Sequence, residues 1–138
     1  MNKVFMVLLR LGVPISRVEK PVVLTVPGRR SGKLRSVPVT PFELDGKRYV
    51  VNGYPGSDWV HNVRAAGEVT LIRGRRSERV RLVEVSLEDA RPVLRALPEA
   101  VPTAVTLWKR VGLITEGTPD EVERLAGRCL VFRVDPVT

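Results

Sequence analysis

The chain has only one cysteine and one histidine in 138 residues. A single cysteine cannot form an internal disulfide or a thiolate metal cluster, and zinc needs more His, Cys or carboxylate ligands than are clustered in this sequence. Cys129 stands in an apolar run and is predicted to be a small, buried hydrophobic residue. We therefore expect no metal site, and a lone reduced thiol is consistent with a cytoplasmic location.

Long apolar runs are also missing. None approaches the ~20 residues that a transmembrane helix needs, and the apolar start of the chain is short, interrupted by Arg10 and without a small-residue cleavage site. We predict that residues 1–12 form a short amphipathic helix that covers the core. The alternative is peripheral membrane association of this segment, with Lys3, Arg10 and Arg17 near the lipid headgroups.

The usual catalytic constellations are absent as well. Ser57, Asp58 and His61 are close in sequence, but side chains one and three residues apart at a helix start rarely reach the geometry of a catalytic triad. We predict instead that His61 caps or packs that helix. No pair of carboxylates stands out, and no phosphate loop of the G-x-x-x-x-G-K-[ST] type is present. We therefore expect no catalytic side chain, so that in an enzyme of this sequence a cofactor would supply the chemistry.

What the chain does have is positive charge, formally +8 at pH 7. This charge favours nucleic acid, anionic lipid or a small ligand with several negative charges. The aromatic residues do not alternate with cations along one strand, as they would in a sheet that stacks RNA bases. Nucleic-acid binding therefore rests on charge alone, mainly on the arginines within residues 73–81. We interpret those arginines as a solvated hairpin and do not expect a nucleic-acid partner.

The most informative segment is residues 27–39, the turn between two predicted strands. It contains Gly28, Gly32, two serines and four cations, Arg29, Arg30, Lys33 and Arg35. Glycine lets the backbone approach a ligand, successive N–H groups can form an anion-binding nest, and arginine matches phosphate or carboxylate. The turn is a candidate cradle for a phosphorylated cofactor. A solvated basic hairpin turn is the alternative.

The remaining pattern predicts one α+β domain over residues 1–138, with about six mainly antiparallel strands in a small barrel and peripheral helices. Pro38 and Pro41 remove backbone donors and should lie at a sheet edge or a gap, and Asp45-Gly46 predicts a type I′ hairpin. The predicted strands are 22–26, 36–44, 47–52, 69–73, 79–85 and 130–134, and the predicted helices are 59–66, capped by Asp58, 86–97, one around 105–111 and one from 118 to Gly127. So narrow a barrel cannot enclose a large ligand, so a cofactor would lie in an external groove or at a homodimer seam.

Two segments together resemble one known family. Residues 28–39 are similar to the G-R-x-S-G-x-x-R-x-x-P pattern of the deazaflavin (F420)-dependent nitroreductases and quinone reductases, and residues 59–70 to that family's W-x-H-N-L-x-A-N-P-x-V-T segment. The resemblance covers residues 22–85 and implies a split β-barrel of the FMN-binding type. It implies an oxidoreductase in which reduced coenzyme F420 transfers a hydride to a quinone, a nitroaromatic or a similar unsaturated acceptor.

The resemblance also assigns residues. The cofactor has a phosphodiester and an oligoglutamate tail, and the basic turn would hold this tail through Arg29, Arg30, Ser31, Gly32, Lys33 and Arg35. The ring system would lie against Val37, Pro38, Val39, Asn52, Gly53 and Tyr54, with Trp59 and Asn62 completing the cofactor site. Tyr54, Trp59 and Trp108 are candidates for the wall of the acceptor site, although Trp108 also suits a helix packed on the barrel. FMN is the alternative cofactor, because related split barrels bind it.

Overall fold

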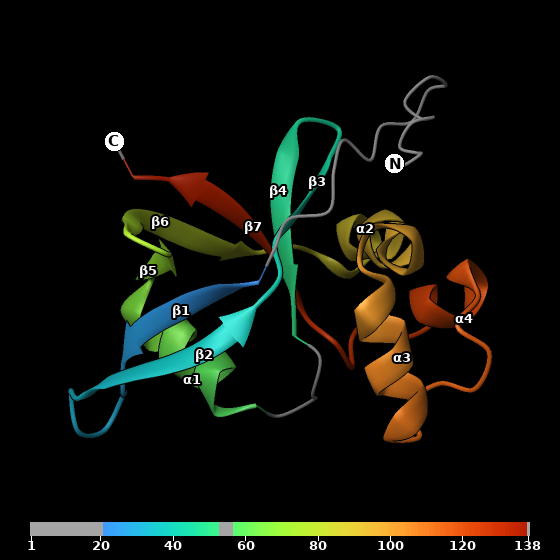
Figure 1. Ribbon diagram of the computed structural model, residues 1–138, viewed down its shortest axis with the longest axis horizontal. Coiled ribbons are helices and arrows are strands. Elements are labelled where there is room, and N and C mark those ends of the chain that lie inside the picture. Colours follow the sequence, from blue (N-terminus) through green and yellow to red (C-terminus); the bar gives the residue numbers. More distant parts are fainter. Residues whose placement is uncertain (1–20, 53–56, 138) are drawn as a thin grey trace.

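The computed structural model describes residues 21–52 and 57–137, and in these residues seven strands form one curled antiparallel sheet, a half-barrel accompanied by four helices (Figure 1). The strand order is β2-β1-β5-β6-β7-β4-β3. The strands are β1 (Val22–Pro27), β2 (Leu34–Val39), β3 (Phe42–Leu44), β4 (Lys47–Val51), β5 (Glu68–Arg73), β6 (Arg76–Glu84) and β7 (Val131–Pro136). The helices are α1 (Asp58–Ala66), α2 (Leu87–Ala100), α3 (Pro102–Arg110) and α4 (Pro119–Glu123). The predicted α+β barrel is confirmed.

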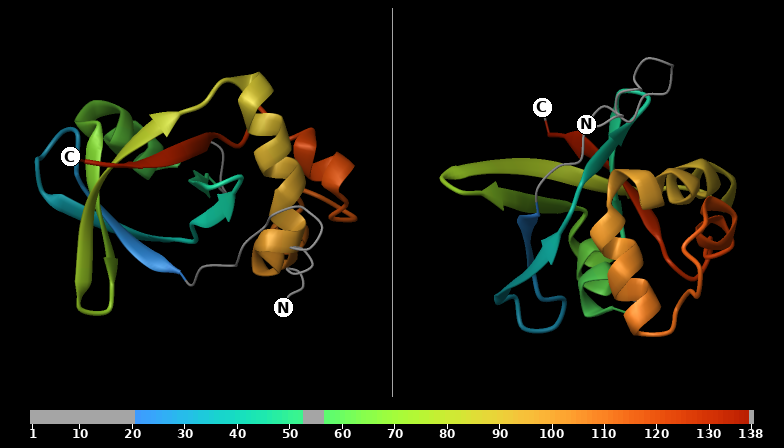
Figure 2. Two further views of the ribbon diagram at one scale, coloured as in Figure 1. Left: turned by 90° about the horizontal axis from the view of Figure 1, so that it is seen from above. Right: turned by 45° about the vertical axis from the view of Figure 1, so that its right-hand side comes forward.

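The prediction of a single strand over residues 36–44 is wrong. This segment forms β2 and β3, which are separated by Thr40 and Pro41 and lie at the two opposite ends of the sheet. Proline cannot donate a ladder hydrogen bond, so the predicted edge position of Pro38 and the break at Pro41 have the same cause. Because two residues join the two end strands, the sheet has to curl until its edges approach each other (Figure 2).

Hairpins connect β1 to β2, β3 to β4 and β5 to β6. Asp45 and Gly46 have φ angles of 54° and 77°, as both central residues of a type I′ turn require, so the turn predicted between β3 and β4 is confirmed. Strands β5 and β6 pair in register from Glu68 with Arg81 to Arg73 with Arg76. The alternate residues Val69, Leu71, Val80 and Leu82 are buried, which leaves Glu68, Arg79 and Arg81 on the outer face of the hairpin.

Helix α2 departs from its predicted length. It begins as expected after Ser86, whose Oγ accepts a hydrogen bond from the Asp89 N–H at 3.1 Å, but it continues to Ala100 and contains Pro98. A proline this close to the end removes only one helical hydrogen bond. Burial of Leu94, Leu97 and Ala100 outweighs that loss, so the expectation that Pro98 breaks the helix is wrong.

Two helix ends also differ from expectation. Ser57, not Asp58, is the N-cap residue of α1, and Asp58 is its first helical residue. Helix α4 begins as predicted, since Thr118 Oγ1 accepts from the Glu121 N–H at 3.1 Å, but it ends at Glu123, before Gly127. No helix in the described residues is long and apolar enough to cross a membrane. The helix predicted over residues 1–12 lies outside them.

The core has two parts. Helix α1 closes the inside of the half-barrel, where Val60 and Val63 pack with Leu24, Val69 and Phe132. Helices α2, α3 and α4 form the second part beside it, around residues that include Trp108 and Cys129. Cys129 is fully buried, and this burial raises the pKa of its thiol to about 11. The prediction that Cys129 is a buried core residue is confirmed.

The loop between α3 and α4 is held by one carboxylate. Glu121 accepts hydrogen bonds from the backbone N–H groups of Thr115, Glu116 and Gly117 at 2.7, 2.8 and 2.7 Å, and from Thr115 Oγ1 at 3.0 Å. These bonds, with that from the Thr115 N–H as the largest contribution, lower the pKa of Glu121 from 4.5 to about 2. The ionised carboxylate therefore holds residues 115–117 of the loop against the start of α4.

This contact predicts an acid-sensitive contribution to stability. The folded state holds the pKa of Glu121 below its ordinary value of 4.5, so the stabilisation is fully present above that pH and is lost as the pH falls towards 2. We expect Glu121→Gln to lower the melting temperature at pH 7 and to differ progressively less from the wild type between pH 4.5 and 2. Thermal unfolding monitored by circular dichroism measures this. Glu116→Gln, an exposed change of the same charge in the same loop, is the control, and a gap between Glu121→Gln and wild type that does not change with pH would contradict the assignment.

Candidate cofactor site

The basic turn between β1 and β2, residues 28–33, is a closed loop. The Gly28 N–H donates to the carbonyl of Lys33 at 2.7 Å, and the Gly32 N–H donates to the carbonyl of Gly28 at 2.9 Å. A Cβ atom on Gly28 would lie 3.3 Å from both the Lys33 carbonyl oxygen and Ser31 Oγ, and Gly32 has a φ of +77°. Both glycines are therefore needed for this turn to fold so tightly.

Helix α1 holds the turn through Asn62. Its side chain is 5% exposed, and its Oδ1 accepts two hydrogen bonds from Arg29, one from the backbone N–H and one from Nη1, each at 3.0 Å. Asp58, one helical turn earlier, lies 3.8 Å from Arg29 Nη2. The α1 side chains therefore fix both the backbone and the guanidinium of Arg29, which is the first cation of the turn.

A cavity of about 500 Å³ lies between this turn, strand β2 and α1, and we call it the cationic cavity. It is lined by Val26, Gly28, Arg29, Arg30, Ser31, Arg35, Ser36, Val37, Asp58, Trp59 and Asn62. The lining holds three arginines and one carboxylate. Within residues 21–52 and 57–137, Arg30 and Arg35 form no ion pair. Their guanidinium groups are therefore available to an anionic ligand.

A second cavity, of about 470 Å³, lies between β2, the end of β4 and helix α3, and we call it the apolar cavity. Its lining is Val37, Pro38, Val39, Thr40, Val51, Asn52, Ser57, Trp59, Leu97, Val101, Thr103, Ala104, Leu107 and Trp108. Among the described residues that line it, none carries an ionisable carboxylate, imidazole, amine or guanidinium group. Its walls suit a flat, largely apolar ring system with a few polar groups that fix orientation.

The two cavities share Val37 and Trp59. Trp59 is half-buried and packs its indole against Phe132 of the core, with ring centroids 5.7 Å apart and planes tilted by 50°. Trp59 therefore contacts the core of the barrel and lies at the junction between the cationic and the apolar cavity. A ligand with an anionic end and an aromatic end fits such a pair of compartments.

The structure brings most of the predicted site residues together. Those that line one or both cavities are Arg29, Arg30, Ser31, Arg35, Val37, Pro38, Val39, Asn52, Trp59, Asn62 and Trp108. Gly32 and Lys33 are exposed in the same turn and line neither cavity. Gly53 and Tyr54 lie outside the described residues. Trp108 is only 2% exposed, so it is chiefly a core residue whose edge reaches the apolar cavity.

Of the wall that α3 forms in the apolar cavity, sequence reasoning found only Trp108. Ala104 and Leu107 of α3 and its N-cap residue Val101 also line the cavity at helical spacing, a periodicity that predicts an amphipathic helix but not what the helix faces. Leu107 is 40% exposed. An apolar helical residue left exposed beside a half-barrel is a signal that could have indicated a ligand-facing wall.

His61 stays apart from this site. It is exposed on α1 and lines neither cavity, whereas Asp58, Trp59 and Asn62 of the same helix line the cationic cavity. The prediction that His61 packs the helix is therefore wrong, because the helix turns this position towards solvent. In the described part of the chain, no three His, Cys, Asp or Glu side chains gather as a metal site.

Solved structures share this fold. A structure described as an F420-H2 dependent reductase (FDR-A) has a TM-score of 0.56 and 23% identity, covering 90% of this chain and 100% of its own. A domain-swapped dimer has a TM-score of 0.56 and 25% identity over 96% of this chain and 95% of its own. A FAD-binding protein from Mesorhizobium loti, at 14% identity, has a TM-score of 0.53 and covers 90% of this chain and 86% of its own.

The sequence itself matches a family profile over residues 7–109, and that family is described as F420H2-dependent quinone reductase. A search of curated proteins gave no match. The matched range contains the basic turn, strand β2, helix α1 and most of α3, which are the elements that build both cavities. The chain therefore belongs to the F420H2-dependent quinone reductase family, and it is an oxidoreductase that uses the reduced deazaflavin F420 to reduce a small-molecule acceptor.

Proposed function

We propose that coenzyme F420 lies along the two cavities, with its phosphate and oligoglutamate tail in the cationic cavity and its ring system in the apolar cavity. The observation that carries this proposal is that Val37 and Trp59 line both compartments. The cofactor has a planar ring at one end and several negative charges at the other. The free guanidinium groups of Arg30 and Arg35 meet the anionic end, and the residues of β2 pack against the ring.

Positioning is the main task of the protein in this proposal. When bound, reduced F420 supplies a hydride to the acceptor. The apolar walls contributed by β2 and α3 exclude water, Asn52, which is 1% exposed, contributes an amide at the base of the cavity, and Trp59 offers an aromatic surface to a planar acceptor. Holding two reactants in the correct orientation supplies much of the rate enhancement where no acid or base takes part.

Two further statements belong to this proposal. We expect a homodimer, because β2 and β3 are end strands of the sheet and one relative of this fold is a domain-swapped dimer. We also keep the cytoplasmic location and, for the N-terminal segment, the alternative of peripheral membrane association through its apolar residues and Lys3, Arg10 and Arg17. Static light scattering tests the homodimer, and flotation with anionic vesicles tests the membrane association.

FMN remains the alternative cofactor, and visible absorption of the purified protein would reveal it.

The proposed position of the cofactor's oligoglutamate tail leads to a testable prediction. Exposed charge contacts contribute roughly 0.2–1 kcal/mol each, so Arg29→Ala/Arg30→Ala should weaken F420 binding by about 2-fold to 30-fold at low salt and by less at high salt. Fluorescence titration of the cofactor measures the dissociation constant. Arg91→Ala/Arg128→Ala removes the same charge from exposed positions that line neither cavity and serves as the control. Equal dissociation constants for Arg29→Ala/Arg30→Ala and wild type in both salts would rule the assignment out.

Asn62 is expected to act as a positioning residue through Arg29. Asn62→Ala removes the acceptor of the part-buried hydrogen bond from the Arg29 N–H, which should cost about 0.5–1.5 kcal/mol of stability and raise the KM for F420, while kcat at saturating cofactor stays within a few-fold of wild type. Melting temperature and steady-state kinetics give the two readouts. Asn62→Gln keeps an accepting amide oxygen without adding charge to the cationic cavity and should restore part of the affinity. A large fall in kcat with an unchanged KM would contradict a positioning role.

His61 should be dispensable. Because it is exposed and outside both cavities, His61→Ala should keep most of its turnover with a quinone and with a nitroaromatic, measured as oxidation of reduced F420. Loss of a general acid or base typically lowers the rate by ~10²–10⁴-fold. A loss of that size, with folding and cofactor affinity intact, would identify a proton-transfer role for this histidine.

A further inference from the structure

A third cavity, of about 560 Å³, opens on the other side of the basic turn, and we call it the outer groove. It lies where the end of β1 and the end of α1 meet strands β5 and β6, and its charged lining is Arg29, Glu68, Arg79 and Arg81. Gly28 and Arg29 line both the outer groove and the cationic cavity. An extended ligand that leaves the cationic cavity over the start of the turn therefore enters the outer groove.

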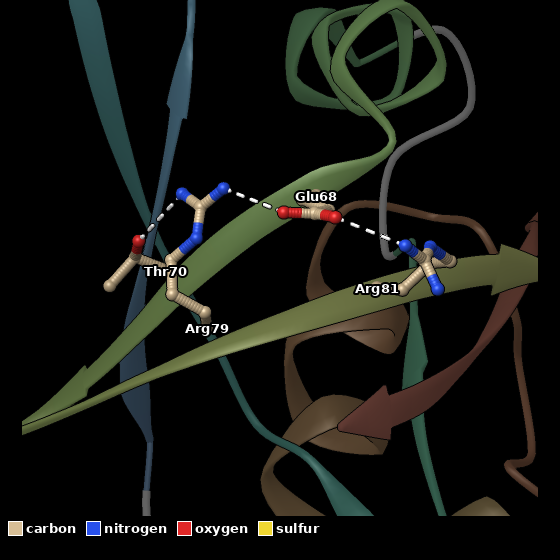
Figure 3. A network of polar contacts seen from close by, with 4 residues as sticks. All are labelled: Glu68, Thr70, Arg79 and Arg81. Carbon is tan, nitrogen blue, oxygen red and sulfur yellow. Dashed lines mark hydrogen bonds and ion pairs between the residues drawn. The ribbon is translucent and has the colours of Figure 1, made fainter. Parts of the chain in front are cut away.

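Two arginines of the outer groove already bind one carboxylate of the chain itself, that of Glu68. Arg79 Nη2 donates to Glu68 Oε1 at 2.9 Å and Arg81 Nη2 donates to Glu68 Oε2 at 3.0 Å, so that one carboxylate bridges two guanidinium groups (Figure 3). The hairpin register explains this arrangement, because Glu68 pairs with Arg81 and Thr70 with Arg79. All four side chains consequently lie on one face, opposite the buried valines and leucines of the same strands.

Glu68 does not saturate these arginines. Each guanidinium carries five N–H donors; Glu68 takes one from each, and Thr70 Oγ1 accepts a long bond of 3.4 Å from Arg79 Nη1. The side chains of Arg79 and Arg81 are 59% and 53% exposed, so their remaining donors reach solvent. Two positive charges against one negative charge leave this pair with a net positive charge beside Arg29.

We propose that Arg79 and Arg81 form a second anion subsite, which binds a carboxylate of a polyanionic chain that continues out of the cationic cavity. For the cofactor of this family, that chain is the outer part of the oligoglutamate tail. The inference rests on the proposed function, because it requires the inner part of the tail to occupy the cationic cavity. Glu68 acts as an internal competitor, since it occupies the donors that a tail carboxylate would use.

The test compares F420 that carries a long oligoglutamate tail with F420 trimmed enzymatically to a single glutamate, with both dissociation constants measured by fluorescence titration at low salt. Wild type should bind the long-tailed form more tightly. Arg79→Gln/Arg81→Gln should weaken binding of the long-tailed form by about 2-fold to 30-fold, as expected for two exposed charge contacts, and leave the trimmed form unchanged. Glu68→Gln removes the competitor and should strengthen binding of the long-tailed form alone.

The matched control is Arg75→Gln/Arg76→Gln, which removes the same charge from the same hairpin at exposed positions outside the outer groove. A similar loss in this control, or an equal loss for long and trimmed tails in Arg79→Gln/Arg81→Gln, would show a general field effect and overturn the subsite. Unchanged binding of the long-tailed form in that variant would overturn it too. If wild type binds neither form, the proposed function itself fails. Circular dichroism confirms that each variant is folded.

Discussion

The short connection between β2 and β3 is the constraint on which the rest of the structure depends. These strands are the two ends of a seven-stranded sheet in the described residues, and only Thr40 and Pro41 join them. The sheet therefore has to curl. Curling leaves β2 as an open edge. The cationic cavity lies between β2 and α1, and the apolar cavity lies between β2 and α3. The site is thus a consequence of how the barrel remains incompletely closed.

Electrostatics divides this edge into compartments. Near the turn, the arginines outnumber the one carboxylate in the lining, and Asn62 fixes the first of them by two hydrogen bonds. Past Trp59, the lining contributed by residues 37–52 and 57–108 carries no charged side chain. Low polarity strengthens the few polar contacts made there and excludes water. A cofactor with a charged tail and an aromatic ring is therefore oriented in one direction along the groove by desolvation and charge together.

The sequence predicted those elements that local chemistry determines. The Asp45-Gly46 turn and the Ser86 and Thr118 caps each depend on residues adjacent in the chain, and all were found. Strand β1 was also found, but its continuous apolar run predicts burial on both faces, whereas Val23 is 39% exposed and only one face is buried. The basic turn and its Asn62 partner were assigned to one site because two motifs matched the family in order. Residues that depend on distant packing were missed. Pro98 stays helical because α2 is buried against α4 and the sheet, and the α3 wall faces a cavity formed by strands more than fifty residues earlier.

The sharing of Val37 and Trp59 by both compartments has an evolutionary consequence. A substitution at either position changes the cofactor-binding surface and the acceptor-binding surface together. Its effect on binding of one ligand is therefore coupled to its effect on binding of the other. Adaptation to a new acceptor is easier from the α3 side, where Leu107 and Thr103 line the apolar cavity alone. Substrate choice can therefore change through substitutions on α3, while Val37 and Trp59 stay constrained because each substitution there affects both ligands.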